Sequence, residues 1–274
     1  MCRLLGYCSR KGAASLGELL GEDALREFTR LSAYHRDGWG MAWYDGQHPR
    51  LEKSRLAAAE DGRYAELAHR RLGDLGLLHL RRATPGVPIR ESNSHPFRNG
   101  TVMMAHNGAI YPQSRLAEML PQAWEQQLTG STDSERYFLH VMSRAAAHGG
   151  DMLTALAETT AHIDHLFQAT SLNAVFTTAD ALYAVCWYDP GSIPCGAVAQ
   201  QGYQGPPERY FDLAYLQTPG AVVVASSGWQ QAGWTWLPNR HVLVVDRTTL
   251  LTTVKRLDAT RQPLPSAAPA TAGC

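Results

Sequence analysis

The sequence lacks long apolar segments and an excess of either charge. No apolar stretch approaches the ~20 residues that a helix needs to span a bilayer. Its 25 basic and 25 acidic residues give a formal net charge of +0, whereas a nucleic-acid-binding protein usually carries surplus Lys and Arg to neutralise phosphates. The N-terminus, MCRLLGYCSRKG, has too short an apolar part for a signal peptide. We therefore expect a cytoplasmic protein with no nucleic-acid or membrane partner.

The usual patterns of metal, nucleotide and disulfide sites are also missing. The sequence has no CxxC, no HExxH, no GxGxxG after a strand, and no GxxxxGKS or GxxxxGKT. If residues 2–8 form a strand at ~3.3 Å per residue, its two cysteines lie about 20 Å apart, too far for a disulfide or a shared metal ion. We expect no cofactor, no metal and no disulfide framework among the five cysteines: Cys2, Cys8, Cys186, Cys195 and Cys274.

Strand-like apolar runs dominate both ends of the sequence, and the longest helical periodicities lie in the middle. This order favours sheets covered by helices over a repeated βαβ unit. The last residues, 258–274, contain one bulky apolar side chain, Leu264, and predict a disordered tail. The predicted strands are 2–8, 40–44, 75–82, 101–106, 173–178, 182–188, 221–226, 241–246 and 250–257, and the predicted helices are 15–33, 60–72, 113–120, 133–148 and 151–167.

Cys2 is a candidate nucleophile because removal of Met1 would make it the first residue. A free α-amino group has a pKa of about 7.7–8.0, so part of it is neutral base at physiological pH. It could take the proton from the Cys2 thiol, placing nucleophile and general base on one residue. The alternative is a buried cysteine at the start of an edge strand, and position alone favours that alternative.

Six short motifs that follow one another in order favour the catalytic interpretation. MCRLLGY, DGWGMAWY, HLRRAT, NSHPF, HNG and STDSE together resemble the signature of class II glutamine amidotransferases, a branch of the N-terminal-nucleophile (Ntn) hydrolases. The chain is most similar to the short, stand-alone members, which include the γ-glutamyl hydrolase of ergothioneine biosynthesis. The resemblance implies an α+β fold, a four-layer αββα sandwich of two mainly antiparallel sheets, formed by one domain over residues 2–257.

The resemblance also implies roles for individual residues. Arg81 matches the arginine that binds the α-carboxylate of glutamine, and a guanidinium can do so through two parallel hydrogen bonds. Asp133 matches the aspartate that binds the α-ammonium group. Asn107 and Gly108 match the donors of an oxyanion hole. Each residue also has a structural alternative: Arg81 a surface arginine like Arg82, Asn-Gly a tight turn, and Asp133 an acidic residue in a first helical turn.

Three further positions belong to the predicted pocket. Thr84 would help to hold the carboxylate end of the substrate, and Gly38 and Trp39 lie in the glycine-rich turn expected to shape the pocket near Cys2. The histidines of these motifs are read as neutral structural residues. Three tryptophans in the segment 228–238 could form one wall of an open mouth, or instead be core residues or cover a sheet edge: Trp229, Trp234 and Trp236.

The predicted function is hydrolysis of the γ-amide of glutamine or of a γ-glutamyl amide through a γ-glutamyl thioester on Cys2, releasing glutamate. The partner is then a small-molecule γ-glutamyl substrate. Two alternatives stay open. One is a glutaminase subunit that delivers ammonia to a separate synthase in trans, and the other is a catalytically inactive Ntn-fold binding protein. An inactive scaffold would not need Cys2, Arg81, Asn107 and Asp133 together.

Overall fold

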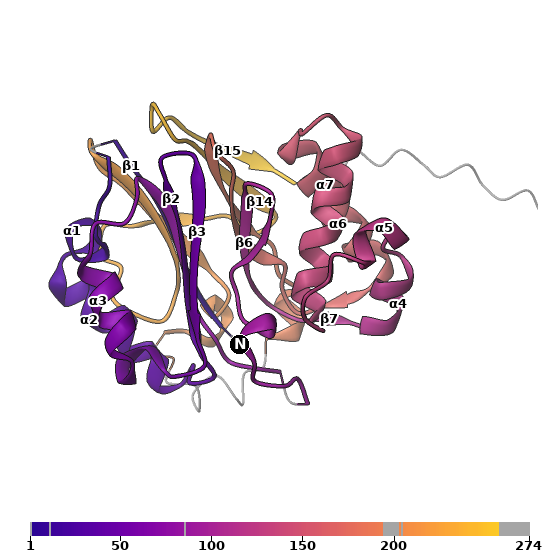
Figure 1. Cartoon of the computed structure of the whole chain (residues 1–274), viewed down its shortest axis with the longest axis horizontal. Helices are drawn as coiled ribbons and strands as arrows, with labels where there is room; N and C mark the ends of the chain where they lie inside the picture. The colour runs from indigo at the N-terminus through magenta and orange to yellow at the C-terminus, as the bar shows by residue number, and fades with distance from the viewer. Residues whose placement is uncertain (1, 11, 85, 194–202, 204, 258–274) are drawn as a thin grey trace, which may run out of the picture.

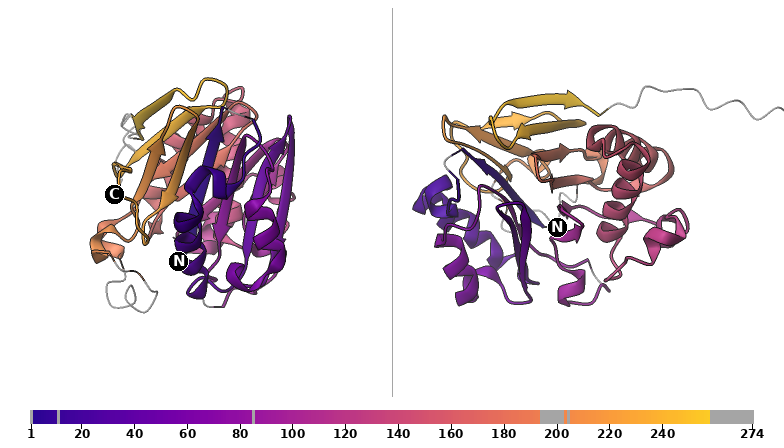
Figure 2. Two further views of the ribbon diagram at one scale, coloured as in Figure 1. Left: turned by 90° about the vertical axis from the view of Figure 1, so that its left-hand side faces the viewer. Right: turned by 45° about the horizontal axis from the view of Figure 1, so that its top comes forward.

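Two β-sheets stack face to face between two layers of helices (Figure 1; Figure 2). Successive side chains of a strand point to opposite faces, so each sheet needs one apolar cover from the other sheet and one from helices. No helix among the described residues is long and apolar enough to cross a membrane. The computed structural model describes residues 2–10, 12–84, 86–193, 203 and 205–257.

The first sheet has seven strands, and the N-terminal strand lies at its centre. All pairings in this sheet are antiparallel, and Leu5 of β1 faces Ala225 on one side and Leu78 on the other. The start of β1 is therefore fixed by strands on both sides. The strand order is β13 (Thr235–Leu237), β11 (Leu213–Gln217), β12 (Ala221–Ser226), β1 (Arg3–Ser9), β4 (Leu75–Leu80), β2 (Trp39–Asp45) and β3 (His48–Ser54).

The second sheet has six strands and is also antiparallel throughout. A separate two-stranded sheet of β7 (Ile110–Tyr111) and β8 (Gln168–Ala169) lies beyond the end of β6. The strand order of the six is β15 (Thr252–Arg256), β14 (His241–Asp246), β10 (Ala181–Cys186), β9 (Asn173–Thr177), β6 (Val102–Asn107) and β5 (Phe97–Asn99).

The helices divide between the two outer faces. α1 (Leu16–Leu20), α2 (Glu22–Arg30) and α3 (Gly62–His69) share an apolar cluster with the seven-stranded sheet. The six-stranded sheet packs in the same way on α6 (Asp133–Ala147) and α7 (Met152–Leu166). The short helices α4 (Gln113–Glu118) and α5 (Gln122–Glu125) flank α6.

The core between the sheets is apolar and closely packed. Leu4, Val175 and Val224 are at most 1% exposed and belong to one cluster of buried side chains from both sheets. A Cβ built on Gly6 would lie 2.7 Å from Cγ1 of Val175, so the central strand approaches the other sheet too closely for a side chain at this position. The predicted four-layer αββα sandwich is confirmed.

The predicted element boundaries need several corrections. The helix predicted over 15–33 is two α-helices that meet at Gly21, whose φ of 83° ends the first one. Every predicted strand is present, but β3, β5, β7, β8, β11 and β13 were not predicted. The predicted tail at 258–274 lies outside the described residues, and the single domain over 2–257 stays a prediction.

Candidate active site

The Cys2 side chain lies between the two sheets at the start of β1. It points to the same face of the strand as Leu4 and Cys8, and it is 8% exposed. Figure 1 marks the start of the chain between the two helix layers, towards the lower side of the view. The backbone of Arg82, just after β4, contacts the sulfur twice. Its amide nitrogen lies 3.3 Å and its carbonyl oxygen 3.4 Å from Cys2 Sγ.

The surroundings of Cys2 disfavour a spontaneous thiolate. Burial raises the pKa of the Cys2 thiol, and the Arg82 backbone hydrogen bond and the positive charges of Arg81 and Arg3 oppose this increase. Only the thiolate is a strong nucleophile. Chemistry at this sulfur therefore requires a base close to it.

Asn107, the last residue of β6, connects the Cys2 backbone to the other sheet. Its Oδ1 accepts a hydrogen bond of 2.8 Å from the Cys2 nitrogen. With Met1 attached this nitrogen is an amide, and it stands in for the α-amino group that removal of Met1 would create. The Asn107 side chain is buried, and its Nδ2 has no hydrogen-bond partner among the described residues. A buried amide donor without an acceptor is costly and rare.

Gly108 follows Asn107 where the chain leaves β6. A Cβ at this position would lie 1.8 Å from the carbonyl oxygen of Ser171, so no other residue fits without moving the backbone. His106 fixes the same region: its Nε2 lies 3.0 Å from Ser171 O and its Nδ1 2.9 Å from Ser134 Oγ. Because a carbonyl only accepts, Nε2 carries the proton and Ser134 donates to Nδ1.

Arg81 ends the β4 segment and is held by the glycine-rich turn before β2. Its backbone N–H donates to Gly38 O at 2.8 Å, and its guanidinium donates to Asp37 O at 3.2 Å and to Pro88 O at 3.3 Å. The Asp37 carboxylate accepts from the Ala83 N–H at 2.7 Å, which orders the chain just after Arg81. Arg81 as a whole is only 3% exposed, and these two carbonyls hold its guanidinium in place.

Asp133 is the first residue of α6. The helix begins here because Thr132 caps it, with its side-chain oxygen accepting from the Glu135 N–H. One carboxylate oxygen of Asp133, Oδ2, accepts from the Ile110 N–H at 2.8 Å. Within the described part of the chain, no hydrogen bond occupies the other oxygen, so it can accept one from a ligand.

Cys2, Arg81, Gly108 and Asp133 line one small cavity. Its volume is about 30 Å³. The lining residues are Cys2, Arg81, Arg82, Ala83, Thr84, Val87, Asn93, His95, His106, Gly108, Thr132, Asp133 and Ser134.

Three predicted site residues do not line this cavity: Asn107, Gly38 and Trp39. Asn107 contacts the site through its hydrogen bond to the Cys2 nitrogen. Gly38, with a φ of 123°, contacts the site only through its carbonyl oxygen, which binds Arg81. The Trp39 side chain is fully buried under the helices, where it packs on Tyr64 and donates from Nε1 to Asp61. The turn thus positions Arg81 through its backbone, and the Trp39 ring lies in the core.

The tryptophan-rich segment does not form a wall of this cavity, so the open-mouth expectation was wrong. Trp229 packs edge-to-face on Phe28 of α2 and on Trp234, with ring centroids 5.9 and 5.3 Å apart. Trp236 lies in β13 at the edge of the sheet, with the Arg209 guanidinium 5.3 Å from its ring. These rings cover the core and a sheet edge, which was the alternative interpretation.

Sequence reasoning missed four residues that arrange the site. Asp37 orders the chain after Arg81, and Asn93 donates to Pro88 O at 3.1 Å while accepting from the Ser131 N–H at 2.9 Å. Ser134 fixes the His106 ring. Each lies inside a recognised motif, which was the available signal. Arg3, beside Cys2, is 1% exposed, and its guanidinium lies 4.5 Å from the centre of the Tyr210 ring.

Comparison with known proteins places this geometry in a family. A relative from Mycobacterium tuberculosis, gamma-glutamyl-hercynylcysteine sulfoxide hydrolase, is 26% identical over 274 residues, covering 96% of this chain and 100% of its own. The protein of that name from Mycolicibacterium smegmatis is 28% identical over 211 residues, or 76% and 77% of the two chains.

A solved structure shows the same fold. The glutamine aminotransferase class-II domain protein from Silicibacter pomeroyi matches with a TM-score of 0.64 and 21% identity, covering 94% of this chain and 100% of its own. The family model for class-II glutamine amidotransferases matches residues 1–192, more than half of the sequence. The chain therefore belongs to the class II glutamine amidotransferases, a family of enzymes, as the ordered motifs predicted.

Proposed function

We propose that the protein is an N-terminal cysteine hydrolase of γ-glutamyl amides, with Cys2 as the nucleophile after loss of Met1. The observation that carries this proposal is the arrangement of Asn107. Its Oδ1 holds the nitrogen that would become the α-amino base, while its buried Nδ2 has no partner among the described residues. An unpaired amide donor beside a nucleophile suits the negative oxygen of a tetrahedral intermediate.

The proposed reaction needs no cofactor. The α-amino group takes the proton from Cys2 Sγ, and the thiolate attacks the γ-carbonyl carbon. Asn107 Nδ2 and the Gly108 N–H donate to the oxyanion. The intermediate collapses to a γ-glutamyl thioester, and the departing amine takes the proton from the α-ammonium group. Water then attacks the thioester, the same amino group accepts its proton, and glutamate leaves as the thiol is restored.

Arg81 and Asp133 are proposed to bind the two charged ends of the glutamyl group. Both line the cavity with Cys2, from the β4 end and the α6 start respectively. The guanidinium suits the α-carboxylate, and the free carboxylate oxygen of Asp133 suits the α-ammonium. Thr84, which lines the same cavity, is proposed to contact the carboxylate end.

The preferred substrate is proposed to be a γ-glutamyl amide with a bulky amine, acting in the cytoplasm. Support comes from the two mycobacterial relatives, whose names describe γ-glutamyl hydrolases and whose lengths this chain covers by 77% or more. The tryptophan segment gives no support, because it lies away from the cavity. The rival is a glutaminase that supplies ammonia to a separate synthase.

Labelling and kinetics test the two parts separately. Intact mass should show loss of Met1, and a diazo-ketone analogue of glutamine should alkylate Cys2 but not the buried Cys8 or Cys186, as located by peptide mapping. Full activity in Cys2→Ala, or an adduct on Cys8, would disprove the assignment of Cys2 as the nucleophile.

For the substrate, kcat/KM without a partner should be higher for a γ-glutamyl arylamide than for glutamine. A preference for glutamine, or activity only with a second protein, would favour the ammonia donor.

A further inference from the structure

A second cavity, separate from that of Cys2, opens between the edges of the two sheets. Its volume is about 450 Å³, within the range of small-molecule sites. We propose that it binds a small organic phosphate, with the phosphate held by Lys53 and Arg98 and an apolar body packed on Phe97 and Phe138. This proposal does not depend on the reaction at Cys2.

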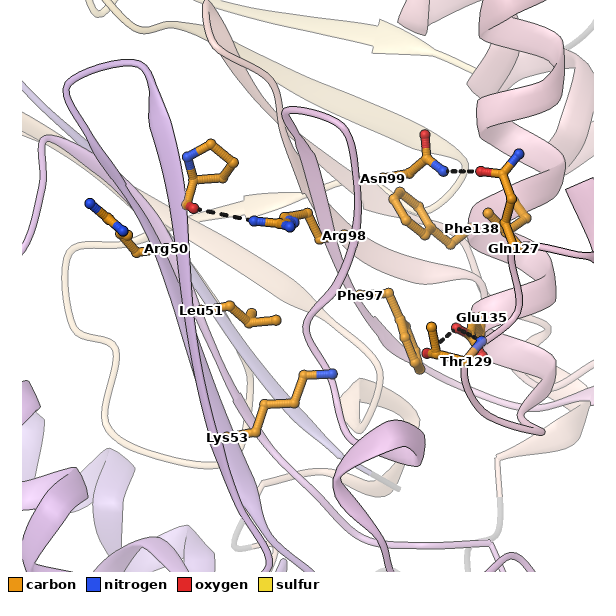
Figure 3. A pocket seen from close by; sticks show the side chains of 12 residues that line it. Arg50, Leu51, Lys53, Phe97, Arg98, Asn99, Gln127, Thr129, Glu135 and Phe138 are labelled. Atoms are coloured by element: carbon orange, nitrogen blue, oxygen red, sulfur yellow. Dashed lines mark hydrogen bonds between the residues drawn. The ribbon is translucent and has the colours of Figure 1, made fainter.

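The two edge strands supply facing side chains. Leu51 and Lys53 are two residues apart on β3, so both point from that strand towards β5 (Figure 3). From the other side, Arg98 extends towards the backbone of β3. Phe97 and Phe138 form the apolar wall near α6. The cavity thus combines cations at the strand edges with aromatic surface behind them.

Lys53 is partly buried without a strong partner. Its Nζ donates to Glu91 O at the long distance of 3.4 Å and lies 5.2 Å from the centre of the Phe97 ring. Burial lowers the pKa of Lys53 to about 8, and the charges of Glu135 and Glu91 oppose this shift. An ammonium in this position gains from an anionic ligand, which would restore the interactions lost with water.

Arg98 also lacks a carboxylate partner. Its guanidinium makes one long hydrogen bond, of 3.5 Å, to Pro49 O. In the described part of the chain, no ion pair involves Arg98 or Lys53. Arg50 differs, because it pairs with Asp45 at 3.3 Å and its guanidinium points away from Arg98 in Figure 3. Two cations that form no direct ion pair match the two negative charges of a phosphate monoester better than a single carboxylate.

The acidic side chain in the cavity is already satisfied. Glu135 accepts from the N–H and hydroxyl of Thr129 at 2.8 and 2.7 Å, and from the Gly130 N–H at 2.7 Å. It therefore does not neutralise Lys53 by a direct ion pair. Ser131, which follows Gly130 in the chain, donates its N–H to Asn93, a lining residue of the Cys2 cavity. The loop of residues 129–131 therefore lies between the two cavities.

The rarity of lysine allows a direct test. The sequence has three lysines, Lys11, Lys53 and Lys255, and Lys255 lies exposed on β15. Acetylation of each lysine is followed by mass spectrometry near pH 8, with and without phenyl phosphate. We expect phenyl phosphate to slow acetylation of Lys53 at least ~5-fold, as binding to a charged partner would, and to leave Lys255 unchanged. Equal protection of both lysines, or no protection of Lys53, would overturn the proposal.

Calorimetry with variants and with ligand fragments measures separately how the phosphate charge and the apolar ring contribute to binding. Lys53→Met and Arg98→Gln should each weaken phenyl phosphate binding by ~10-fold, which corresponds to one lost charge-assisted hydrogen bond. Arg63→Gln, a control at an exposed arginine of α3 that does not line the cavity, should leave it unchanged, and melting temperatures confirm that all three variants fold. Inorganic phosphate and benzyl alcohol should each bind more weakly. Unchanged affinity in Lys53→Met, or equal affinity for inorganic phosphate, is the result that refutes this site.

Discussion

The polar groups around Cys2 differ in how far the protein itself satisfies them. Both ring nitrogens of His106 have partners, whereas Asn107 Nδ2 has none among the described residues. Arg81 is intermediate, because backbone carbonyls occupy two of its guanidinium nitrogens. A donor left free in the folded protein costs stability unless a ligand uses it. This difference supports the proposed ligand contacts of Asn107 and Arg81, and it favours a positioning role for His106.

Arg81→Lys should reduce kcat/KM for a γ-glutamyl amide far more than Arg82→Ala. Lysine cannot reproduce the two parallel hydrogen bonds of a guanidinium, and breaking a partly buried charge pair costs about 2–5 kcal/mol of binding. Arg82 instead contacts the Cys2 sulfur through its backbone, which alanine keeps. Steady-state kinetics and melting curves of both variants give the comparison. The carboxylate role must be abandoned if Arg82→Ala is the more damaging change.

The motifs located most of the site because they mark both position and residue type. Cys2, Arg81, Thr84, Gly108 and Asp133 line one cavity although they come from four distant segments. Sequence reasoning could not see which atoms of a motif face the cavity. The turn at Gly38 acts through a carbonyl oxygen, and the Trp39 ring is turned into the core, because strand alternation and helix packing decide those directions.

At the scale of elements, Glu135 in the first turn of α6 binds the loop of residues 129–131, which lies between the two cavities. Glu135→Gln should lower the free energy of unfolding by about 1–3 kcal/mol, because the new NH2 group would face the Gly130 N–H and leave that partly buried donor unsatisfied. Chemical denaturation measures the change. Glu125→Gln, an exposed position on α5, serves as control. An equal effect of both substitutions would show that the loop contacts contribute little.

The strands that escaped prediction are mostly edge or polar strands. β3 contains a proline and four charged or histidine side chains in seven residues, and it lies at the edge of its sheet. Charged and proline-containing edges are common because they discourage aggregation, but they hide the apolar alternation on which strand prediction depends. The break at Gly21 was missed because the apolar pattern continues on both sides of it.

At the scale of the molecule, one ion pair joins the two sheets at the end of β1 opposite Cys2. Arg247, after β14, binds the Asp74 carboxylate at 2.6 and 3.0 Å and the carbonyls of Ala179 and Gly46 at 2.8 and 2.7 Å. Lysine cannot make these contacts together, so Arg247→Lys should lower stability by about 2–4 kcal/mol. Arg50→Lys, in the exposed pair with Asp45, should change it by less than about 0.5 kcal/mol. Thermal unfolding measures the stability of both variants. Similar losses of stability would show that the Arg247–Asp74 pair does not hold the two sheets together.

Buried histidines should make the whole fold sensitive to acid. Burial lowers the pKa of His79 to about 3 and that of His95 well below its ordinary value, so both stay neutral in the folded protein. In the unfolded chain a histidine titrates near pH 6.5. Between that pH and the folded pKa the unfolded state binds more protons, so each such histidine lowers stability by up to ~1.4 kcal/mol per pH unit as the pH falls.

The slope of stability against pH between 6 and 5 tests this argument. His95 is the informative position, because neither of its ring nitrogens has a partner in the described structure and its ring packs on Phe97 and His79. His95→Phe removes the titrating group while keeping an aromatic ring, so its free energy of unfolding should fall with pH less steeply than that of the wild type by ~1 kcal/mol per pH unit. His48→Gln, exposed on β3, should keep the wild-type slope. Denaturation at several pH values measures both. Parallel curves for His95→Phe and the wild type would mean that His95 gains its proton without unfolding, and hence that acid reaches the histidines around Cys2 in the folded protein.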